Sequence, residues 1–466
     1  MKPKVMFINA IDPIKEIEVC FSPLGLGYLI SSLRKEFGHD SIKFKIINQS
    51  IEQEINSFRP DLICITSVTQ NYGKAVKYAR IAKKYNLPVI VGGVHISMLP
   101  SSLTNDMDVG VIGEGEETII DLFNLFIDTG GLYDKNKLRK INGIAFKDND
   151  NGKLILTKRR KLIEPLDKIP LPARDLFETH SHAYMFTSRG CPYRCVFCAS
   201  SRFWDKVRFF SAEYVVNEIK HLVKRYNVKS IGFWDDLFIL DKKRIERILE
   251  LLKKEGLLGK ISFGCSARAD LINDKIVLLL KKMNIRNISM GLESGCPKTL
   301  GYLKADTLTI KESMNAIRTI KKHGIVCGAS FIIGSPKETE EDILSTLKFI
   351  KESKLDGFDV YVLTPFPGTP VWEYAKERNL VSEDMNWKIL NIRFAENYKK
   401  AVILSEKLTR EKLVELFSQF QKESKRRKIR YLIKAGLKNP FRAPRFLIER
   451  LKWKILSLKR SRGDKR

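Results

Sequence analysis

Short apolar runs alternate with amphipathic stretches through the first quarter of the chain. The segment from Tyr72 to Tyr85 is one amphipathic stretch, and the runs on either side of it are almost wholly apolar. Strands that are buried on both faces and alternate with helices are typical of a parallel, doubly wound α/β sheet. The pattern predicts such a Rossmann-like sheet, with strands at residues 5–9, 44–48, 62–66, 89–92 and 109–112.

A second alternation of strands and helices begins at Ala183. This half has no second glycine-rich crevice, so we interpret it as a partial (β/α)6 barrel of the TIM type, with its chemistry at the carboxyl ends of the strands. Its six strands are predicted at residues 184–188, 230–234, 260–267, 287–292, 325–333 and 357–364. Its helices are predicted at residues 212–226, 242–255, 273–283, 309–323 and 339–353.

Two further signals divide the chain. Residues 143–157 are interpreted as a β-hairpin with a turn at Asn151-Gly152, and a proline-rich connector runs from Pro165 to Pro172. The alternation stops beyond Ala375, and a helix is predicted at residues 408–424. The predicted parts are a first α/β domain over 1–140, a hairpin and linker over 141–182, a barrel over 183–385 and a helical C-terminal region over 386–466.

Three cysteines, Cys191, Cys195 and Cys198, lie on one short stretch with C-x3-C-x2-C spacing. They supply three of the four thiolates that a four-iron cluster takes. A structural zinc site needs four closed ligands, and the histidines nearest to this stretch, His180 and His182, lie upstream of it. An iron site with one open position is therefore predicted. The alternative is three core cysteines that share this spacing by chance.

The cysteine loop resembles the cluster-binding motif of the radical S-adenosylmethionine (radical SAM) enzymes, in which an apolar residue precedes the last cysteine, as Phe197 does here. In that family three cysteines hold a [4Fe-4S] cluster, and S-adenosylmethionine binds the fourth iron through its amino and carboxylate groups. The reduced cluster then cleaves this cofactor to a 5'-deoxyadenosyl radical. The resemblance implies that Cys191, Cys195 and Cys198 hold such a cluster.

Polar residues follow the predicted barrel strands at their carboxyl ends. The resemblance places Asp235 and Asp236 at the amino group of S-adenosylmethionine, Arg268 at its carboxylate and Glu293 near its ribose, while residues 331–334 match the segment that supports adenine. For the aspartates and Ser294 the alternative role is that of a helix N-cap. The implied contacts are Phe197, Asp235, Asp236, Arg268, Glu293, Ser294, Ile332 and Gly334.

Glycine-rich loops follow the strands of the first predicted sheet. Ligands of such sheets bind beyond the carboxyl ends of the strands, and glycine lets the backbone approach a large flat or phosphate-bearing ligand. Tight turns without any ligand are the alternative. Because these loops precede the cysteine loop, the arrangement resembles the cobalamin-binding domain of the B12-dependent radical SAM branch. The implied cobalamin contacts are Gly25, Gly27, Thr66, Ser67, Gly92, Gly93, Gly113 and Glu114.

The D-x-H-x-x-G motif, whose histidine binds cobalt in many other corrinoid proteins, is absent from the sequence. No cobalt-ligating histidine is therefore predicted from such a motif. His95 is the one histidine near the predicted ligand edge, and we interpret it as a loop residue.

Positive charge is concentrated at the C-terminus. The net charge is +29, and residues 422–466 contribute +15 of it, from 18 basic and three acidic residues. Residues 446–459 combine an apolar helical stripe with flanking lysines, which suits a membrane surface. The alternatives are an ordinary docked helix and, less favoured, contact with nucleic acid.

No run approaches the roughly 18 apolar residues that cross a bilayer, and apart from the loop the eight cysteines are scattered. We therefore expect a cytoplasmic protein, with residues 425–466 as a candidate for peripheral association with a membrane surface.

The resemblance implies a cobalamin-dependent radical SAM enzyme with a [4Fe-4S] cluster, S-adenosylmethionine and cobalamin as cofactors. Its expected reaction is methylation of an unactivated carbon in a small-molecule or lipid-like substrate, with an external electron donor of the flavodoxin or ferredoxin type. Three alternatives remain: a radical SAM cyclase, rearrangement or coupling enzyme; a cluster enzyme without corrin; and a corrinoid or cluster sensor that performs no catalysis.

Overall fold

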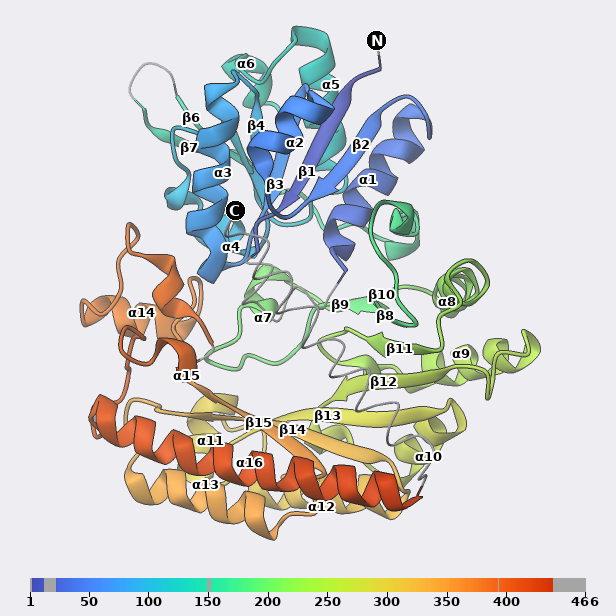
Figure 1. Cartoon of the computed structure of the whole chain (residues 1–466), viewed down its shortest axis with the longest axis vertical. Helices are drawn as coiled ribbons and strands as arrows, with labels where there is room; N and C mark the ends of the chain where they lie inside the picture. The colour runs from blue at the N-terminus through green and yellow to red at the C-terminus, as the bar shows by residue number, and fades with distance from the viewer. Residues whose placement is uncertain (1, 12–21, 149–151, 393, 439–466) are drawn as a thin grey trace.

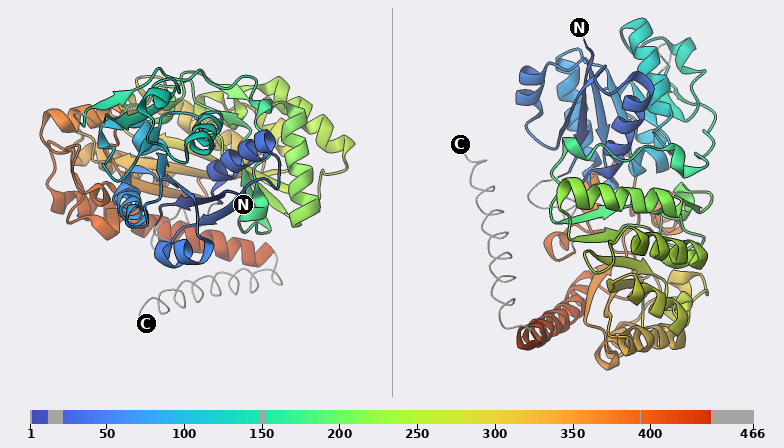
Figure 2. Two further views of the ribbon diagram at one scale, coloured as in Figure 1. Left: turned by 90° about the horizontal axis from the view of Figure 1, so that it is seen from above. Right: turned by 90° about the vertical axis from the view of Figure 1, so that its right-hand side faces the viewer.

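The computed structural model describes residues 2–11, 22–148, 152–392 and 394–438. Two α/β units are stacked, the first sheet above the second, with the C-terminal helices at one side and beneath (Figure 1). The side view in Figure 2 shows the same order of layers. The predicted fold class, a Rossmann-like domain followed by a partial barrel, is confirmed.

The first sheet has seven strands in the order β2-β1-β3-β4-β5-β6-β7. Its first five strands are parallel: β1 (Lys4–Asn9), β2 (Lys43–Ile47), β3 (Leu62–Thr66), β4 (Val89–Gly92) and β5 (Val109–Val111). The helices are α1 (Leu24–Phe37), α2 (Ile51–Phe58), α3 (Tyr72–Lys84), α4 (Val94–Met98), α5 (Thr118–Thr129) and α6 (Lys135–Leu138).

Side chains of β1 alternate between two cores, as the two-residue period of a strand requires. Val5 and Phe7 pack in one core with residues of α1 and α5. Met6 and Ile8 pack in the other with residues of α2 and α3. Helices therefore cover both faces, which explains why the strands are almost wholly apolar.

The predicted hairpin forms and belongs to the first sheet. Strand β6 (Ile144–Lys147) pairs antiparallel with β5, and β7 (Leu154–Leu156) pairs with β6. Strand pairing thus continues past residue 140, the boundary expected from the sequence. Of the predicted turn, Asn151 lies outside the described residues.

The second sheet is parallel throughout, and its strand order, β15-β14-β13-β12-β11-β8, follows the order of the strands in the chain. Such an open, singly wound sheet is a partial barrel. The strands are β8 (His182–Met185), β11 (Ser230–Phe233), β12 (Ser262–Ala267), β13 (Ile285–Glu293), β14 (Val326–Ile333) and β15 (Gly357–Val362). The helices are α8 (Ala212–Tyr226), α9 (Lys242–Lys254), α10 (Asp274–Lys282), α12 (Ile310–Lys322) and α13 (Glu340–Glu352).

The helix starts have identifiable causes. Asp241 and Asn273 are the N-caps of α9 and α10, and each side chain accepts a hydrogen bond from the first turn of its helix. Asp241, and not Asp235 or Asp236, therefore caps α9, the helix that follows this pair. Thr309 and Thr339 open α12 and α13 with complete capping boxes.

The first predicted barrel strand is interrupted. Strand β8 ends at Met185, and Ser188 begins a separate ribbon, β9 (Ser188–Arg189) paired antiparallel with β10 (Arg208–Phe209). The backbone N–H groups of Thr187 and Ser188 donate to Asp235, so the chain leaves the ladder there. Helices α7 (Ser200–Phe203) and α11 (Pro297–Lys304) were also not predicted.

The C-terminal region contains α14 (Pro370–Glu377), η8 (Trp387–Leu390), α15 (Phe394–Asn397) and α16 (Arg410–Lys438). Helix α16 is longer than the predicted helix at 408–424. Beyond the predicted end, Arg427 is buried and donates to the carbonyl groups of Ile350 and Leu355, which fixes the helix against the end of α13. The amphipathic segment predicted at 446–459 lies outside the described residues. Among the described helices, none is both long and apolar enough to cross a bilayer.

The connector between the units is anchored by a buried ion pair. Arg174, in η5 (Arg174–Leu176), donates to Glu218 of α8 at 2.6 Å and to the carbonyl of Tyr184 in β8 at 2.8 Å. Both charged side chains are fully buried. Burial raises the pKa of Glu218, since Arg174 offsets only part of the desolvation.

Replacing Arg174→Ala is expected to lower the free energy of unfolding by about 3–5 kcal/mol, because Glu218 keeps a buried charge without its partner. Urea unfolding of the apoprotein, followed by circular dichroism, measures the effect. Arg247→Ala removes the exposed pair with Glu213 and should leave the unfolding midpoint nearly unchanged. Equal shifts in the two variants would contradict the anchoring role of Arg174.

Candidate active site between the two sheets

The loops after the parallel strands of the first sheet and one face of the second sheet line one cavity of about 1150 Å³. Its lining comes from the loops after β1, β3, β4 and β5 on one side, and from β8, β11, β12, β13 and the two ends of the cysteine loop, Gly190 and Ser200, on the other. The predicted residues Cys191, Cys195, Cys198 and Phe197 are not part of the lining. The predicted ligand edge of the first sheet therefore opens into this space, whereas at the barrel only the segments after β8 and β11 do so, and the residues that follow β12, β13, β14 and β15 do not line it. The volume is large enough for a bulky cofactor together with a smaller molecule.

Glycines shape the side of the cavity that belongs to the first sheet. Gly25, Gly92, Gly93 and Gly113 line it together with Thr66. A Cβ atom on Gly25 or Gly113 would meet no protein atom within 4 Å, so at both places the backbone itself faces open space. Gly93, at φ +100°, has no room for a Cβ, which would lie 2.7 Å from Thr66 Oγ1. This surface fits a large flat ligand that lies directly on the backbone.

Two of the expected cobalamin contacts do not line the cavity. Gly27 packs α1 against the connector, where a Cβ would lie 3.1 Å from both Pro172 and Phe177. Ser67 is buried, and its hydroxyl has no hydrogen-bond partner among the described residues. Glu114 does line the cavity, but Arg189, Arg208 and the backbone N–H of Ile163 engage both of its carboxylate oxygens.

His95 lies on helix α4 and is fully buried, so the expectation of a loop residue was wrong. Its ring lies between Tyr72, with ring centroids 3.9 Å apart, and Trp387, with centroids 4.5 Å apart. Desolvation lowers the pKa of His95 to about 3, which keeps the imidazole neutral. Its Nδ1 is 3.2 Å from Thr69 Oγ1, and it is not among the residues that line the cavity.

The cysteine loop follows β9 directly. Gly190 turns the chain at φ +94°, where a Cβ would lie 2.7 Å from the carbonyl oxygen of Lys206. At the other end, Arg202 Nη1 donates to the carbonyl oxygens of Cys195 at 3.0 Å and of Cys198 at 2.6 Å. The backbone of the loop is thus held by hydrogen bonds from its own chain.

The three thiols fit an iron-sulfur cluster in their chemistry. Iron-sulfur clusters bind cysteine thiolates. Burial first, and then the nearby Asp236, Cys198 and Cys195, raise the pKa of Cys191 to about 11, so binding of iron has to displace a proton from this thiol. Within the described residues, no three cysteine, histidine or carboxylate side chains are already arranged around one metal ion. A four-iron cluster does not require that arrangement, because each thiolate binds a different iron.

Arg268 supports the loop from the barrel. Its guanidinium group lies 3.6 Å from the ring centroid of Tyr193, and Nη1 is 3.9 Å from Cys195 Sγ. The remaining donors bind Asp270 at 2.8 Å and Thr307 at 2.6 Å. Arg268 is buried among these groups and is not part of the cavity lining.

The two adjacent aspartates have different surroundings. Asp235 is buried and accepts hydrogen bonds from Thr187 and Ser188, so it fixes the turn that leads to the cysteine loop. Asp236 is exposed at the cavity and accepts a hydrogen bond from Ser200 Oγ at 2.5 Å. Desolvation by the cavity walls raises the pKa of Asp236. A carboxylate in this environment gains much from a cationic ligand.

The other expected S-adenosylmethionine contacts lie outside the cavity lining. Glu293 accepts from Lys304 Nζ at 2.8 Å, and Lys304 lies 5.8 Å from the ring centroid of Phe197, so Glu293 reaches the cysteine loop indirectly. Ser294 is buried, with its hydroxyl 2.9 Å from Thr346 Oγ1. Ile332 belongs to a hydrophobic core, and a Cβ on Gly334 would touch Leu413.

The sequence analysis did not identify the strand residues of the second sheet that line the cavity and form its floor. On neighbouring strands Gly232, Gly264 and Asn287 lie in one row, and Ser266 and Ser289 lie in the next. These small and polar residues alternate with apolar ones, which is the signal that could have indicated a ligand-facing side of the barrel strands.

Comparisons with known proteins match both halves of the chain. The B12 binding domain family matches residues 12–123, and the Radical SAM superfamily matches residues 185–350. An uncharacterized methyltransferase of Pyrococcus horikoshii is 36% identical over 78% of this chain and 81% of its own length. The anaerobic magnesium-protoporphyrin IX monomethyl ester cyclase of Rubrivivax gelatinosus is 29% identical over 77% of this chain and 67% of its own length.

Solved structures share the fold. The radical S-adenosylmethionine methyltransferase TsrM of Kitasatospora setae, with cobalamin and a [4Fe-4S] cluster bound, has a TM-score of 0.66 at 17% identity and covers 82% of this chain and 76% of its own. The cobalamin-dependent enzyme OxsB, with aqua-cobalamin and S-adenosylmethionine bound, has a TM-score of 0.64 at 20% identity and covers 90% and 61%. With both domains matched and a relative at 36% identity, this chain belongs to the cobalamin-dependent radical SAM enzymes, whose cofactors are a [4Fe-4S] cluster, S-adenosylmethionine and cobalamin.

Proposed function

We propose that this enzyme transfers a methyl group to an unactivated carbon of a small-molecule or lipid-like substrate. The observation that supports it most strongly is one cavity that the glycine-lined loops of the first sheet share with the barrel and with the two ends of the cysteine loop, Gly190 and Ser200. Two cofactors that act on the same substrate carbon must reach one space. The name of the Pyrococcus relative, a methyltransferase, agrees with this proposal.

When bound, the cluster with S-adenosylmethionine supplies a radical that removes hydrogen, and the corrin supplies the methyl group. The chain positions these groups. Cys191, Cys195 and Cys198 hold the cluster in this proposal, and the carboxylate of Asp236 receives the amino group of S-adenosylmethionine. Asp235 keeps the preceding turn in place, and the cavity walls exclude water.

The remaining site residues take supporting roles in this proposal. Arg268 braces the loop through Tyr193 instead of pairing with the cofactor carboxylate, because its donors are already engaged. Glu293 acts through Lys304 on Phe197. We also propose that the cobalamin-binding unit extends through the hairpin to Leu156, since β6 and β7 complete its sheet.

Replacing Cys195→Ala is expected to abolish reductive cleavage of S-adenosylmethionine, because the cluster loses a ligand. After anaerobic reconstitution with iron and sulfide, chromatography measures 5'-deoxyadenosine formed in the presence of a reductant. Cys327→Ala, which alters a buried cysteine of β14, should retain cleavage. Absence of 5'-deoxyadenosine from the parent protein with a loaded cluster would favour a sensor. With a candidate substrate, a product without the mass of one added methylene would favour cyclisation or rearrangement.

Replacing Gly25→Leu is expected to weaken retention of cobalamin at least about fivefold, because the new side chain enters space that the corrin would occupy. The fold should tolerate the change, since Gly25 lies in helix α1 and leucine favours helices more than glycine does. Retention is measured from the corrin absorbance that remains after gel filtration. Gly73→Leu is the matched control, since Gly73 is an open helical position away from the cavity. Equal retention in both variants would contradict the corrin placement.

We also propose that an external flavodoxin- or ferredoxin-type protein reduces the cluster, and that the basic C-terminus binds anionic membrane surfaces. Residues 439–466 contain ten basic and two acidic residues. Attraction of each lysine or arginine to an anionic surface contributes about 1 kcal/mol.

Removal of residues 439–466 is expected to abolish binding to vesicles that contain anionic lipid at low salt. The truncation leaves the described part of α16 intact, including the buried Arg427. Co-sedimentation with anionic and with neutral vesicles measures the effect. Unchanged sedimentation of the shortened chain with anionic vesicles would contradict the surface-binding proposal.

A further inference from the structure

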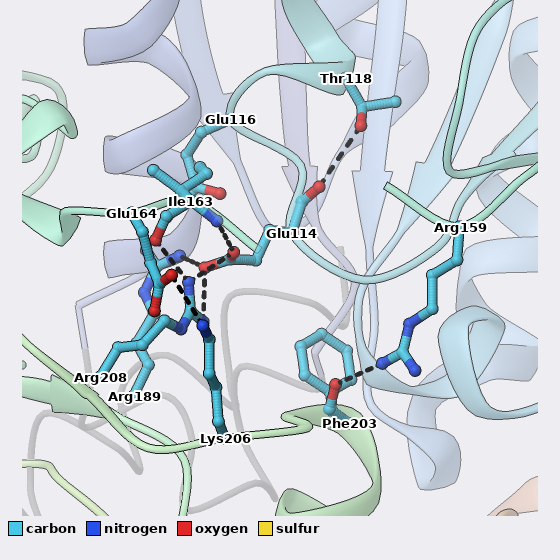
Figure 3. A network of polar contacts seen from close by, with 10 residues as sticks. All are labelled: Glu114, Glu116, Thr118, Arg159, Ile163, Glu164, Arg189, Phe203, Lys206 and Arg208. Atoms are coloured by element: carbon cyan, nitrogen blue, oxygen red, sulfur yellow. Dashed lines mark hydrogen bonds and ion pairs between the residues drawn. The ribbon is translucent and has the colours of Figure 1, made fainter. Parts of the chain in front are cut away.

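Four charged side chains connect the first domain to the β9-β10 ribbon, whose two strands precede and follow the cysteine loop (Figure 3). Glu114 and Glu116 lie in the loop between β5 and α5, and Arg189 and Arg208 lie on β9 and β10. Arg189 donates to Glu114 from Nη1 and to Glu116 from Nη2, both at 2.5 Å. Arg208 donates to Glu114 at 2.8 and 3.1 Å.

These four groups form a closed and buried set. Their side chains are between 2% and 10% exposed, and the two negative charges balance the two positive ones. Glu114 also accepts from the backbone N–H of Ile163, so the connector is bound at the same point. Burying charges is costly even when they are paired, so such a set contributes little net stability for its size. What it does provide is a fixed geometry, because bidentate contacts between guanidinium and carboxylate groups are directional.

The network joins the two cofactor surfaces over a very short length of chain. Glu114 directly follows Gly113, whose backbone faces the cavity, and Arg189 is separated from Cys191 only by the turn at Gly190. Aromatic rings at the cavity support the arginine: the guanidinium carbon of Arg189 lies 5.6 Å from the ring centroids of both Tyr28 and Trp204. A displacement of Arg189 would therefore be transmitted both to the cysteine loop and to the cavity wall.

We propose that Arg189, Glu114 and Glu116 are positioning residues that set the separation between the corrin and the cluster, an inference that rests on the proposed function. Two cofactors that act in turn on one carbon must be held to within a fraction of an ångström, and a misplacement of 1 Å can cost about a hundredfold in rate. The two domains contribute one cofactor surface each, so a directional contact between them is the means of fixing that distance.

The test compares Glu116→Gln with Glu164→Gln in the full chain loaded with cluster and cobalamin. Glu116→Gln removes one of the two charges that hold Arg189 and leaves the contacts of Glu114 in place. Glu164→Gln removes a half-exposed pair with Lys206 in the same neighbourhood and is the matched control. Arg189→Lys is a second variant, which keeps the charge but cannot reach both carboxylates in a fork.

The readout is the magnetic interaction between cobalt(II) and the reduced cluster, seen as splitting and broadening of the cobalt signal in electron paramagnetic resonance. This interaction depends steeply on the distance between the two centres. In Glu116→Gln and Arg189→Lys this interaction is expected to become weaker and to cover a wider range of strengths, with cobalamin retention and cluster content unchanged. Glu164→Gln should reproduce the parent spectrum.

The inference would be overturned if both network variants gave the spectrum of the parent. It would also be overturned if Glu164→Gln changed the cobalt signal as much as the network variants do. If one network variant fails to fold, the other gives the decision. Failure of the proposed function would appear elsewhere, as a parent enzyme that forms no 5'-deoxyadenosine or yields no methylated product. The cobalt-cluster interaction does not depend on either product, so the two failures are distinguishable.

Discussion

The placement of the first sheet against the barrel is the constraint on which the rest of the structure depends. Parallel strands present their loops, glycines and helix starts at their carboxyl ends, and here that edge of the first sheet faces strands β8, β11, β12 and β13 of the barrel across one cavity. Both units are needed to line this cavity. The connector, its anchor at Arg174 and the arginine-carboxylate network at Glu114 all serve to keep the two units in this position.

The barrel residues near the cysteine loop fall into two groups, those that bind other protein groups and those that face the cavity. Arg268, which contacts the cysteine loop, and Asp235, which fixes the turn before it, have their hydrogen-bonding capacity engaged by the protein. Asp236 is exposed at the cavity, and the small residues of the barrel floor, such as Gly264, leave space there. The site therefore has a rigid outer layer of satisfied charges and an inner surface that is free to bind ligands.

The sequence predicted most of the fold because the responsible signals are local. The strands and helices of both sheets follow from apolar periodicity, and the cysteine spacing identified the cluster loop. The site was harder, since its geometry depends on contacts between distant residues. Nothing near Arg268 in the sequence indicates that Tyr193 and Thr307 engage its guanidinium group. The sequence likewise could not show that Asp235 is buried and that Asp236 is exposed at the cavity, because two adjacent aspartates differ only in the direction of their side chains.

The hydrogen bonds from Arg202 to the carbonyl groups of Cys195 and Cys198 hold the backbone of the cysteine loop without involving the cluster. Iron-sulfur clusters are vulnerable to oxygen, and a loop that collapsed on losing its cluster would have to refold before it could bind another. Here the backbone that presents two of the three thiols is held by a neighbouring side chain of the same short segment. These hydrogen bonds go to carbonyl oxygens and leave the thiol groups unused, so the same contacts are compatible with cysteines that bind iron and with cysteines that do not.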